Sequence, residues 1–244
     1  MFCWLEIETT GASGLIEDVV VLPGDSGDDE DEVYYTVKRT VNSATVRHIE
    51  KWAMESECVG GTTNKQADSF VTFTNSPASA TVTGLTHLIG ASVVVWADGK
   101  CLDDASGDIA TFTVSASGTI TLTDGGSSYA ATTGVAGLAY RARWKSAKLG
   151  ATLTQHKNID HLGLVLADTH HKGLKFGPDY DNMDYLSQEY LGTPVATDTV
   201  YTAFDEEPFI FPGKWSTDSR ICLEANAPRP VTVLAAVVDG TVNA

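Results

Sequence analysis

The chain has 244 residues, 43% of them hydrophobic, and a formal net charge of −16 at pH 7. Acidic side chains repel nucleic-acid phosphates, so this charge argues against sequence-specific DNA binding. No stretch approaches the roughly twenty apolar residues that span a bilayer, and no basic residue precedes an apolar core near Met1. We therefore expect neither a membrane segment nor a secretory signal.

The composition favours strands over helices. Glycine is abundant, with 22 residues, and Thr, Ser and Val are plentiful, whereas Lys, Gln and Met are scarce. This bias is typical of many short strands joined by turns. We expect an all-β protein. Residues 1–61 and 135–244 are predicted to form a larger β domain, a sandwich or barrel, and residues 62–134 an inserted small β-barrel or sandwich.

The first quarter of the chain predicts four strands, over residues 3–8, 17–22, 32–40 and 44–53. Val41-Asn42-Ser43 separates the last two and favours a tight turn, so these strands are predicted to form a β-hairpin. The polar, glycine-rich stretch that follows is typical of a linker or extended loop.

The densest β pattern comes next. Runs over residues 70–73, 80–83, 92–96, 111–114 and 119–123 recur about every ten residues, with turn residues between them. The last two alternate apolar residues with Thr, so one face of each is expected to pack while the other faces water. This spacing is typical of a small sandwich or barrel.

The remaining chain predicts strands over residues 140–145, 161–167, 220–224 and 230–238. Between the second and third of these strands the pattern weakens over residues 173–212, which several glycines and prolines interrupt. We expect a long surface loop region there, where subunits interlock or a tip protrudes.

Three of these segments resemble one protein family. The hairpin, DEVYYTVKRTVNSATVRHIE over residues 31–50, is similar to the passage DEVWxVVxRTINGATxRYIE of tail nozzle proteins of short-tailed bacteriophages, also called tail tubular protein B or packaged-DNA stabilisation protein. Residues 82–99 are similar to their GLxHLEGExVxVxADG element, which is compared with the FCCH domain of ubiquitin-activating enzymes. Residues 230–238 look like their C-terminal strand. Tail nozzle proteins are usually longer, so this chain is either a compact member or a C-terminal piece.

The resemblance implies a structural role in a virion tail. It implies a homo-oligomer, a hexameric ring that is assembled in the host cytoplasm and conducts DNA during ejection. The implied partners are tail adaptor and portal-side proteins, a tail fibre or needle, and passing duplex DNA that is not bound sequence-specifically. Acidic residues then either line the lumen or simply keep the protein soluble.

Particular residues are assigned to this role. We predict that Tyr34, Tyr35 and the Arg39/Arg47 pair stabilise the hairpin or form an interface. Residues 173–212 are predicted to make inter-subunit or tip contacts.

Two groups of residues are candidate metal ligands, but neither has the spacing of a known metal-binding motif. His156, His161, His170 and His171 match neither the HxH spacing of a strand nor the HExxH spacing of a helix, and the adjacent pair would point to opposite faces of a strand. The acidic run over residues 25–32 lacks the ligand order of an EF-hand loop, so we expect a solvated turn. No metal site is predicted.

No motif predicts an active site. The chain lacks a GxSxG elbow, and Cys3, Cys58, Cys101 and Cys222 form no CxxC pair and are expected to be buried thiols. The stretch Asp124-Gly125-Gly126-Ser127 opens no helix that would cradle a phosphate. We expect no enzyme activity, no catalytic residue and no cofactor; a hydrolase would need a dispersed site with a His within reach of a Ser or Cys.

The alternative function is a receptor- or carbohydrate-binding β module of a virion surface. In that case the inserted domain would carry an exposed aromatic cluster with convergent polar groups. Protein cores and subunit interfaces are rich in the same aromatic residue types, so we expect the candidates to lie in a core or an interface. The candidates are Trp96, Trp144, Tyr180, Tyr185, Tyr190 and Trp215.

Overall fold

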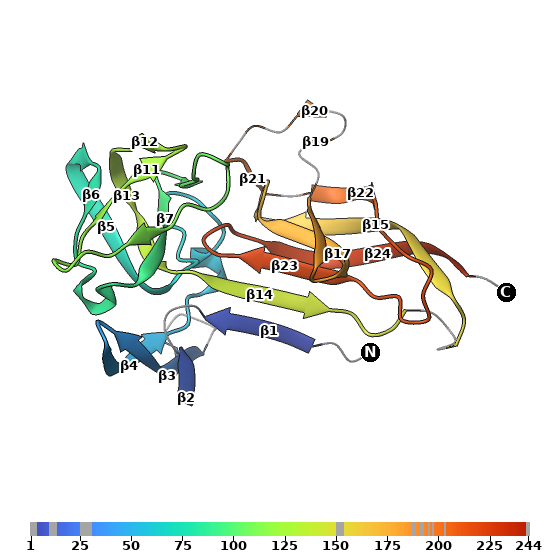
Figure 1. Cartoon of the computed structure of the whole chain (residues 1–244), viewed down its shortest axis with the longest axis horizontal. Helices are drawn as coiled ribbons and strands as arrows, with labels where there is room; N and C mark the ends of the chain where they lie inside the picture. The colour runs from blue at the N-terminus through green and yellow to red at the C-terminus, as the bar shows by residue number, and fades with distance from the viewer. Residues whose placement is uncertain are drawn as a thin grey trace. The chain divides into compact units, whose positions relative to one another are not determined.

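The computed structural model describes residues 4–9, 14–24, 31–149, 154–186, 189–190, 193–194, 196, 198–202 and 204–242. The chain is all-β, as predicted, and its described helices are two 3-10 turns of three residues, Glu55–Glu57 and Thr86–Leu88. Within this part of the chain no helix has the length and apolar character needed to cross a membrane. Figure 1 shows the order of the strands along the chain.

The chain forms two compact units. Residues 1–8 and 141–244 make up one, here called the flanking unit, and residues 9–140 make up the other, the inserted unit. The sequence predicted residues 1–61 as part of the larger domain, whereas residues 9–61 group with the inserted unit in this division. A buried ion-pair network, described below, joins the hairpin to Asp68 of this unit.

A small β-barrel-like assembly of short strands dominates the inserted unit. One sheet has the order β5-β13-β7-β8, with β9 also paired to β7. A single cluster of buried aliphatic and aromatic side chains, including Val93, Val95, Leu122 and Phe112, fills its interior. The strands are β5 (Asp68–Ser79), β6 (Thr81–Val82), β7 (Ser92–Ala97), β8 (Lys100–Cys101), β9 (Phe112–Thr113), β10 (Ile120–Thr121), β11 (Thr123–Asp124), β12 (Ser127–Ser128) and β13 (Ala131–Leu138).

Three further strands of the inserted unit form a separate antiparallel sheet, which we call the arm sheet. Its strands are β2 (Leu15–Leu22), β3 (Glu32–Val41) and β4 (Ala44–Lys51), in the order β2-β3-β4. The turn between β3 and β4 has positive φ at Asn42 (47°) and Ser43 (64°), as a type I′ hairpin requires. The predicted hairpin is therefore confirmed, with Val41 opposite Ala44.

The flanking unit contains two larger sheets. One has five strands in the order β1-β14-β23-β17-β18, and the other has three in the order β22-β15-β24. Leu162, Leu164 and Leu166 of β15 and Phe176 of β17 belong to the same buried cluster, so these sheets face each other across a core. The strands are β1 (Trp4–Thr9), β14 (Tyr140–Lys145), β15 (Lys157–Ala167), β17 (Leu174–Asp179), β18 (Asn182–Tyr185), β22 (Phe204–Ile210), β23 (Cys222–Asn226) and β24 (Thr232–Val242).

The prediction of a long surface loop region over residues 173–212 is wrong. This stretch holds β17, β18 and β22, together with β19 (Glu189–Tyr190), β20 (Thr193–Pro194) and β21 (Val200–Tyr201), which pairs with β16 (Thr169–His170). Phe176 pairs with Leu223 from far along the chain, and the β17–β23 ladder ends at Gly177, one residue before Pro178. The proline therefore removes no ladder hydrogen bond, and its presence did not mark a loop.

Gly134 provides a test of packing in the inserted unit. It lies in β13 between β5 and β7, and a Cβ atom there would come within 2.3 Å of the Trp96 carbonyl oxygen. We expect Gly134→Ala to lower the free energy of unfolding by about 1–3 kcal/mol, because backbone atoms must shift. Urea denaturation measures this loss. The exposed variant Ser128→Ala, expected to stay within about 0.5 kcal/mol of the wild type, is the control; equal stability of both variants would contradict the packing.

Candidate functional site

The arm sheet is anchored by one buried arginine. Arg39 is 1% exposed, and its Nη2 lies 3.0 Å from Glu50 Oε2 and 3.7 Å from Asp68 Oδ2. Ser69 Oγ donates to the same Glu50 carboxylate. Beside this network Val37 is fully buried. Strands β3 and β4 of the arm sheet are therefore fixed to the start of β5.

The other predicted hairpin residues divide between two faces. Arg47 is opposite Lys38, while Arg39 is opposite Val46, so the two arginines point to opposite faces of the sheet. Arg47 is exposed and its Nε donates to Glu17 Oε2 of β2 at 2.6 Å. Arg39 and Arg47 are thus no functional pair, since one is an internal anchor and the other a surface link.

The two tyrosines also stabilise the hairpin locally. Tyr34 donates its hydroxyl to Glu32 Oε2 at 2.7 Å. The Tyr35 ring meets the edge of Trp52, with 6.2 Å between ring centroids. Burial, and then the nearby carboxylates of Asp68 and Glu50, raise the pKa of Tyr35 above its ordinary value. Both side chains stabilise the arm, as predicted for hairpin residues.

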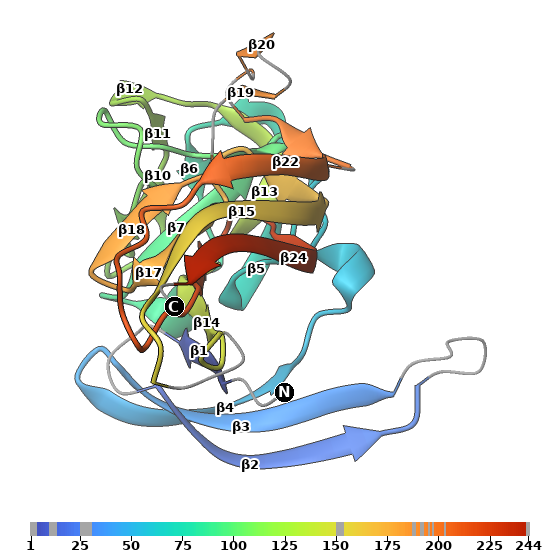
Figure 2. The same ribbon diagram turned by 90° about the vertical axis from the view of Figure 1, so that its right-hand side faces the viewer.

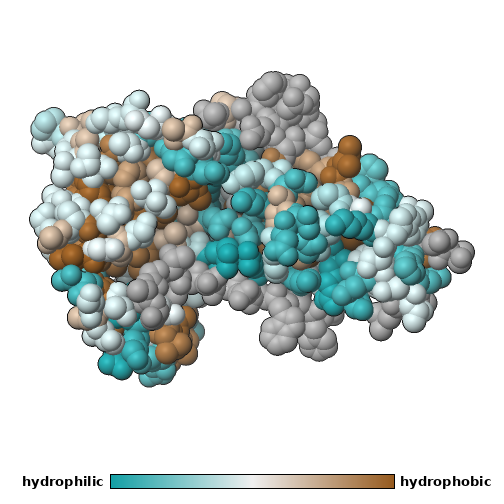
Figure 3. Space-filling view, viewed as in Figure 1, coloured by the Kyte–Doolittle hydropathy of each residue, from teal (hydrophilic) through white to brown (hydrophobic). Residues whose placement is uncertain are grey.

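The outer strand of the arm, β2, is an apolar strand with an open edge. It pairs with β3 on one side, and no strand in the described residues pairs with it on the other. Its aliphatic side chains are 47–60% exposed, and Figure 3 shows brown, apolar surface in the region of this sheet. Such an edge is a template for a further strand. The exposed residues are Leu15, Ile16, Val19, Val20, Val21 and Leu22.

A second open edge lies in the flanking unit. β24 has eleven residues and pairs with β15, and no described strand covers its other side (Figure 2). Leu234 is 64% exposed and Val237 is 49% exposed. Among the described strands, β2 and β24 are therefore two long apolar strands that each have an uncovered edge.

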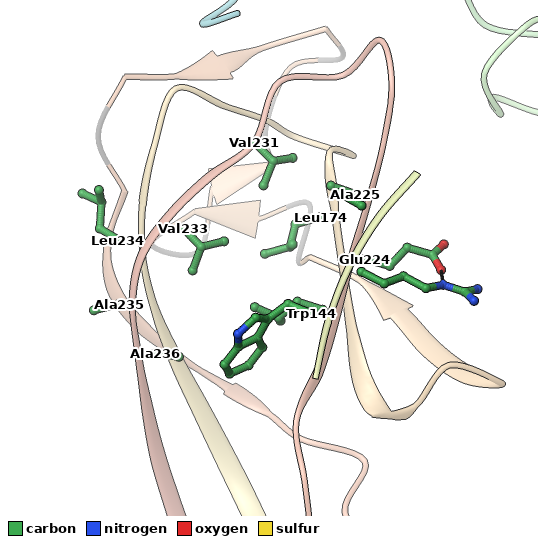
Figure 4. A pocket seen from close by; sticks show the side chains of 12 residues that line it. Trp144, Leu174, Glu224, Ala225, Val231, Val233, Leu234, Ala235 and Ala236 are labelled. Carbon is green, nitrogen blue, oxygen red and sulfur yellow. Dashed lines mark hydrogen bonds and ion pairs between the residues drawn. The ribbon is translucent and has the colours of Figure 1, made fainter. Parts of the chain in front are cut away.

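A groove of about 430 Å³ runs beside the inner face of β24. Figure 4 shows Trp144, Leu174 and Val233 pointing into it, from β14, the start of β17 and β24. At its rim Arg143 Nε donates to Glu224 Oε2 at 2.7 Å. Burial raises the pKa of Glu224, but hydrogen bonds from Arg143 and Asn226 outweigh it and hold this pKa below its usual value. The groove is otherwise apolar.

The four histidines do not gather into one site. His156 and His161 are exposed, whereas His170 and His171 are buried with their ring centroids 4.5 Å apart. The adjacent pair does not diverge as it would along a strand, because β16 ends at His170 and the chain turns at His171. Over the described ranges there is no group of three His, Cys, Asp or Glu residues arranged to hold a metal ion.

His170 is held in its neutral form. Burial is the main reason that its pKa falls to about 2, and the neighbouring positive charges of His171, Arg229 and Lys172 add to this effect. Its Nδ1 accepts a hydrogen bond from the Lys172 backbone amide at 3.2 Å. The ring is therefore part of a polar region of the core.

The described cysteines belong to no metal or disulfide site. Cys58, Cys101 and Cys222 are thiols rather than disulfides, and burial raises the pKa of Cys58 to about 11. Cys3 and residues 25–30 of the acidic run lie outside the described residues. Asp124-Gly125-Gly126-Ser127 is a hairpin turn between β11 and β12, with positive φ at both glycines.

The candidate aromatic residues occupy different environments. Trp96 is fully buried and its Nε1 donates to the Gly61 carbonyl at 2.7 Å. The ring centroid of Tyr180 lies 4.5 Å from the Arg143 guanidinium carbon, and the ring centroid of Tyr185 lies 4.6 Å from Lys175 Nζ. Trp144 lines the groove and Trp215 is 52% exposed, while the side chain of Tyr190 is not among those described.

Comparison with protein-family models and with curated proteins finds no match to this chain. Among the described residues, the open edges of β2 and β24 are the feature that best suggests a function. Their signal in the sequence is a run of consecutive apolar residues, VVVL over residues 19–22 of β2 and VLAAVV over residues 233–238 of β24, which makes both faces apolar, unlike a strand with one wet face.

The anchor of the arm sheet can be tested by comparing two arginines. Arg39→Met leaves the Glu50 carboxylate buried without its cation, and we expect the free energy of unfolding to fall by roughly 3–5 kcal/mol. Arg47→Met removes an exposed ion pair, and we expect little change. Chemical denaturation of both variants gives the comparison. Similar losses in the two would show that Arg39 is not the anchor.

The burial of neutral His170 predicts loss of stability in acid. Its folded pKa lies below the unfolded value, so its contribution is complete above about pH 6.5 and is lost as the pH falls towards 2. Between pH 6.5 and 5 we expect the unfolding free energy of the wild type to fall more steeply than that of His170→Asn, by up to about 1.4 kcal/mol per pH unit. Exposed His161→Asn serves as the control and should keep the wild-type slope. Equal slopes for His170→Asn and the wild type would contradict this burial.

Proposed function

We propose that the protein is a structural subunit of a bacteriophage tail nozzle, a ring that conducts DNA during ejection. The observation that carries the proposal is that two apolar strands of an acidic all-β chain, β2 and β24, each have one edge that no described strand covers, because such edges suit assembly with other subunits. The segments that resemble tail nozzle proteins fall on the hairpin β3–β4, on β6 to β7, and on β24. The resemblance therefore involves the open-edge strand β24 and β3, the strand that pairs with β2.

Charge supports the same function. The inserted unit has 17 acidic and six basic residues, a net charge of −11, while the flanking unit has 15 acidic and ten basic residues, a net charge of −5. A channel wall that repels phosphates lets DNA slide without being retained. In the proposed ring, acidic side chains of the inserted unit are the ones best suited to face the DNA.

The proposal includes partners and a location. The ring is a hexamer in the virion tail, with tail adaptor and portal-side proteins at one end and a tail fibre or needle at the other. It needs no catalytic residue and no cofactor, because its work is mechanical and electrostatic.

No observation favours the alternative of a carbohydrate- or receptor-binding module. That function needs an exposed aromatic cluster on the inserted unit. There Trp96 is buried, and the Tyr129 ring is covered by Lys100 Nζ at 4.6 Å while its hydroxyl donates to Asp98. Trp52 is exposed, but its edge packs against the Tyr35 ring. We therefore propose the structural function alone.

Native mass spectrometry and negative-stain electron microscopy of the purified chain test this function. We expect a ring with a central opening that admits duplex DNA. In a gel-shift assay at low salt, where electrostatic attraction is strongest, we expect no retained duplex DNA. A monomer at every concentration, or tight binding to DNA, would overturn the proposal.

A further inference from the structure

We propose that the open edge of β24 in one copy receives β2 of a second copy. The sheets β22-β15-β24 and β2-β3-β4 then become one continuous sheet across two molecules. This inference deepens the proposed function, since it names the joint between neighbouring subunits.

The flanking unit has the features of a strand acceptor. Its two facing sheets have five and three strands, and the shorter sheet ends at β24. Ala236 and Val238 pair with the buried Leu164 and Leu162, so they point to the inner face of the sheet, where the groove lies. A strand placed beside β24 would pair with its unpaired backbone groups and would direct alternate side chains into the groove.

The arm sheet has the matching donor. β2 is already an extended strand of eight residues with one paired and one open edge. Val19 and Val21 pair with Tyr35 and Val33, so they share one face of the arm. Whichever face of β2 turns inward, it offers Val or Leu side chains to an apolar groove.

The chemistry of both strands favours a second copy as the partner. Two chains of net charge −16 repel each other, so they can associate only where charge is sparse. β24 contains one charged residue, Asp239, and β2 contains Glu17 and Asp18, of which Glu17 is already paired with Arg47. Residues 19–22 of β2 and 233–238 of β24 are thus uncharged, apolar runs on a strongly acidic chain.

The joint uses two different surfaces and therefore has a direction. Each copy offers one donor, β2, and one acceptor, β24, so addition proceeds head to tail. Such heterologous contacts close into a ring or continue as a filament. If the donor β2 is blocked in one molecule and the acceptor β24 in another, one intact donor and one intact acceptor remain. The two molecules can then form a single joint.

Two double variants test this arrangement. Val19→Lys with Val21→Lys blocks the donor, and Leu234→Lys with Val237→Lys blocks the acceptor, since lysines on an edge strand oppose strand addition. All four side chains are 49–64% exposed, so the variants should fold. By native mass spectrometry we expect a multi-subunit wild type and monomers of each variant alone. An equimolar mixture should give a heterodimer and nothing larger.

Matched controls carry the same change at other edges. Ile49 of β4 and Ile210 of β22 are 79% and 82% exposed, and Ile49→Lys and Ile210→Lys should assemble as the wild type does. Circular dichroism and thermal unfolding show whether each variant is folded.

The outcomes separate this joint from the proposed function. A ring that forms equally well from the blocked variants overturns the joint and leaves the nozzle function standing. Filaments or dimers that need both strands, without rings, support the joint and overturn the nozzle. A monomeric wild type, or variant monomers that fail to form a heterodimer when mixed, overturns the joint.

Discussion

Every β-strand has backbone hydrogen-bond donors and acceptors along two edges. The need to pair both edges shapes the protein more than any single side chain. Within the barrel of the inserted unit and between β17 and β23, neighbouring strands meet it. At β2 and β24, one edge of each strand remains without a described neighbour while its aliphatic side chains stay in water. An exposed polar backbone flanked by apolar side chains is suited to another strand.

The ion pair between Arg39 and Glu50 fixes the arm at the side away from its open edge. This buried network fixes β3 and β4 to the start of β5. It does not include β2, which is linked to the arm by its ladder with β3 and by the exposed pair of Glu17 with Arg47. The charges thus fix two strands and leave the third as an apolar, accessible border.

Electrostatics and apolar edges have complementary effects in the proposed assembly. The acidic surplus opposes random association and retention of DNA, whereas the uncharged apolar runs of β2 and β24 permit contact at defined places. A subunit with one donor and one acceptor gains directionality from its topology, without any catalytic or metal chemistry. The buried neutral His170 belongs to the core of the flanking unit and has no part in this joint.

The sequence by itself determined the local elements. Period-two patterns and the Asn42-Ser43 turn predicted the all-β class and the hairpin, because neighbouring residues specify them. Tertiary structure alone decided what depends on distant pairing. It made strands within residues 173–212, where Phe176 meets Leu223, and it turned Arg39 inward and Arg47 outward. It also decided which apolar strands keep an open edge, since a strand's second neighbour comes from a segment that local pattern does not identify.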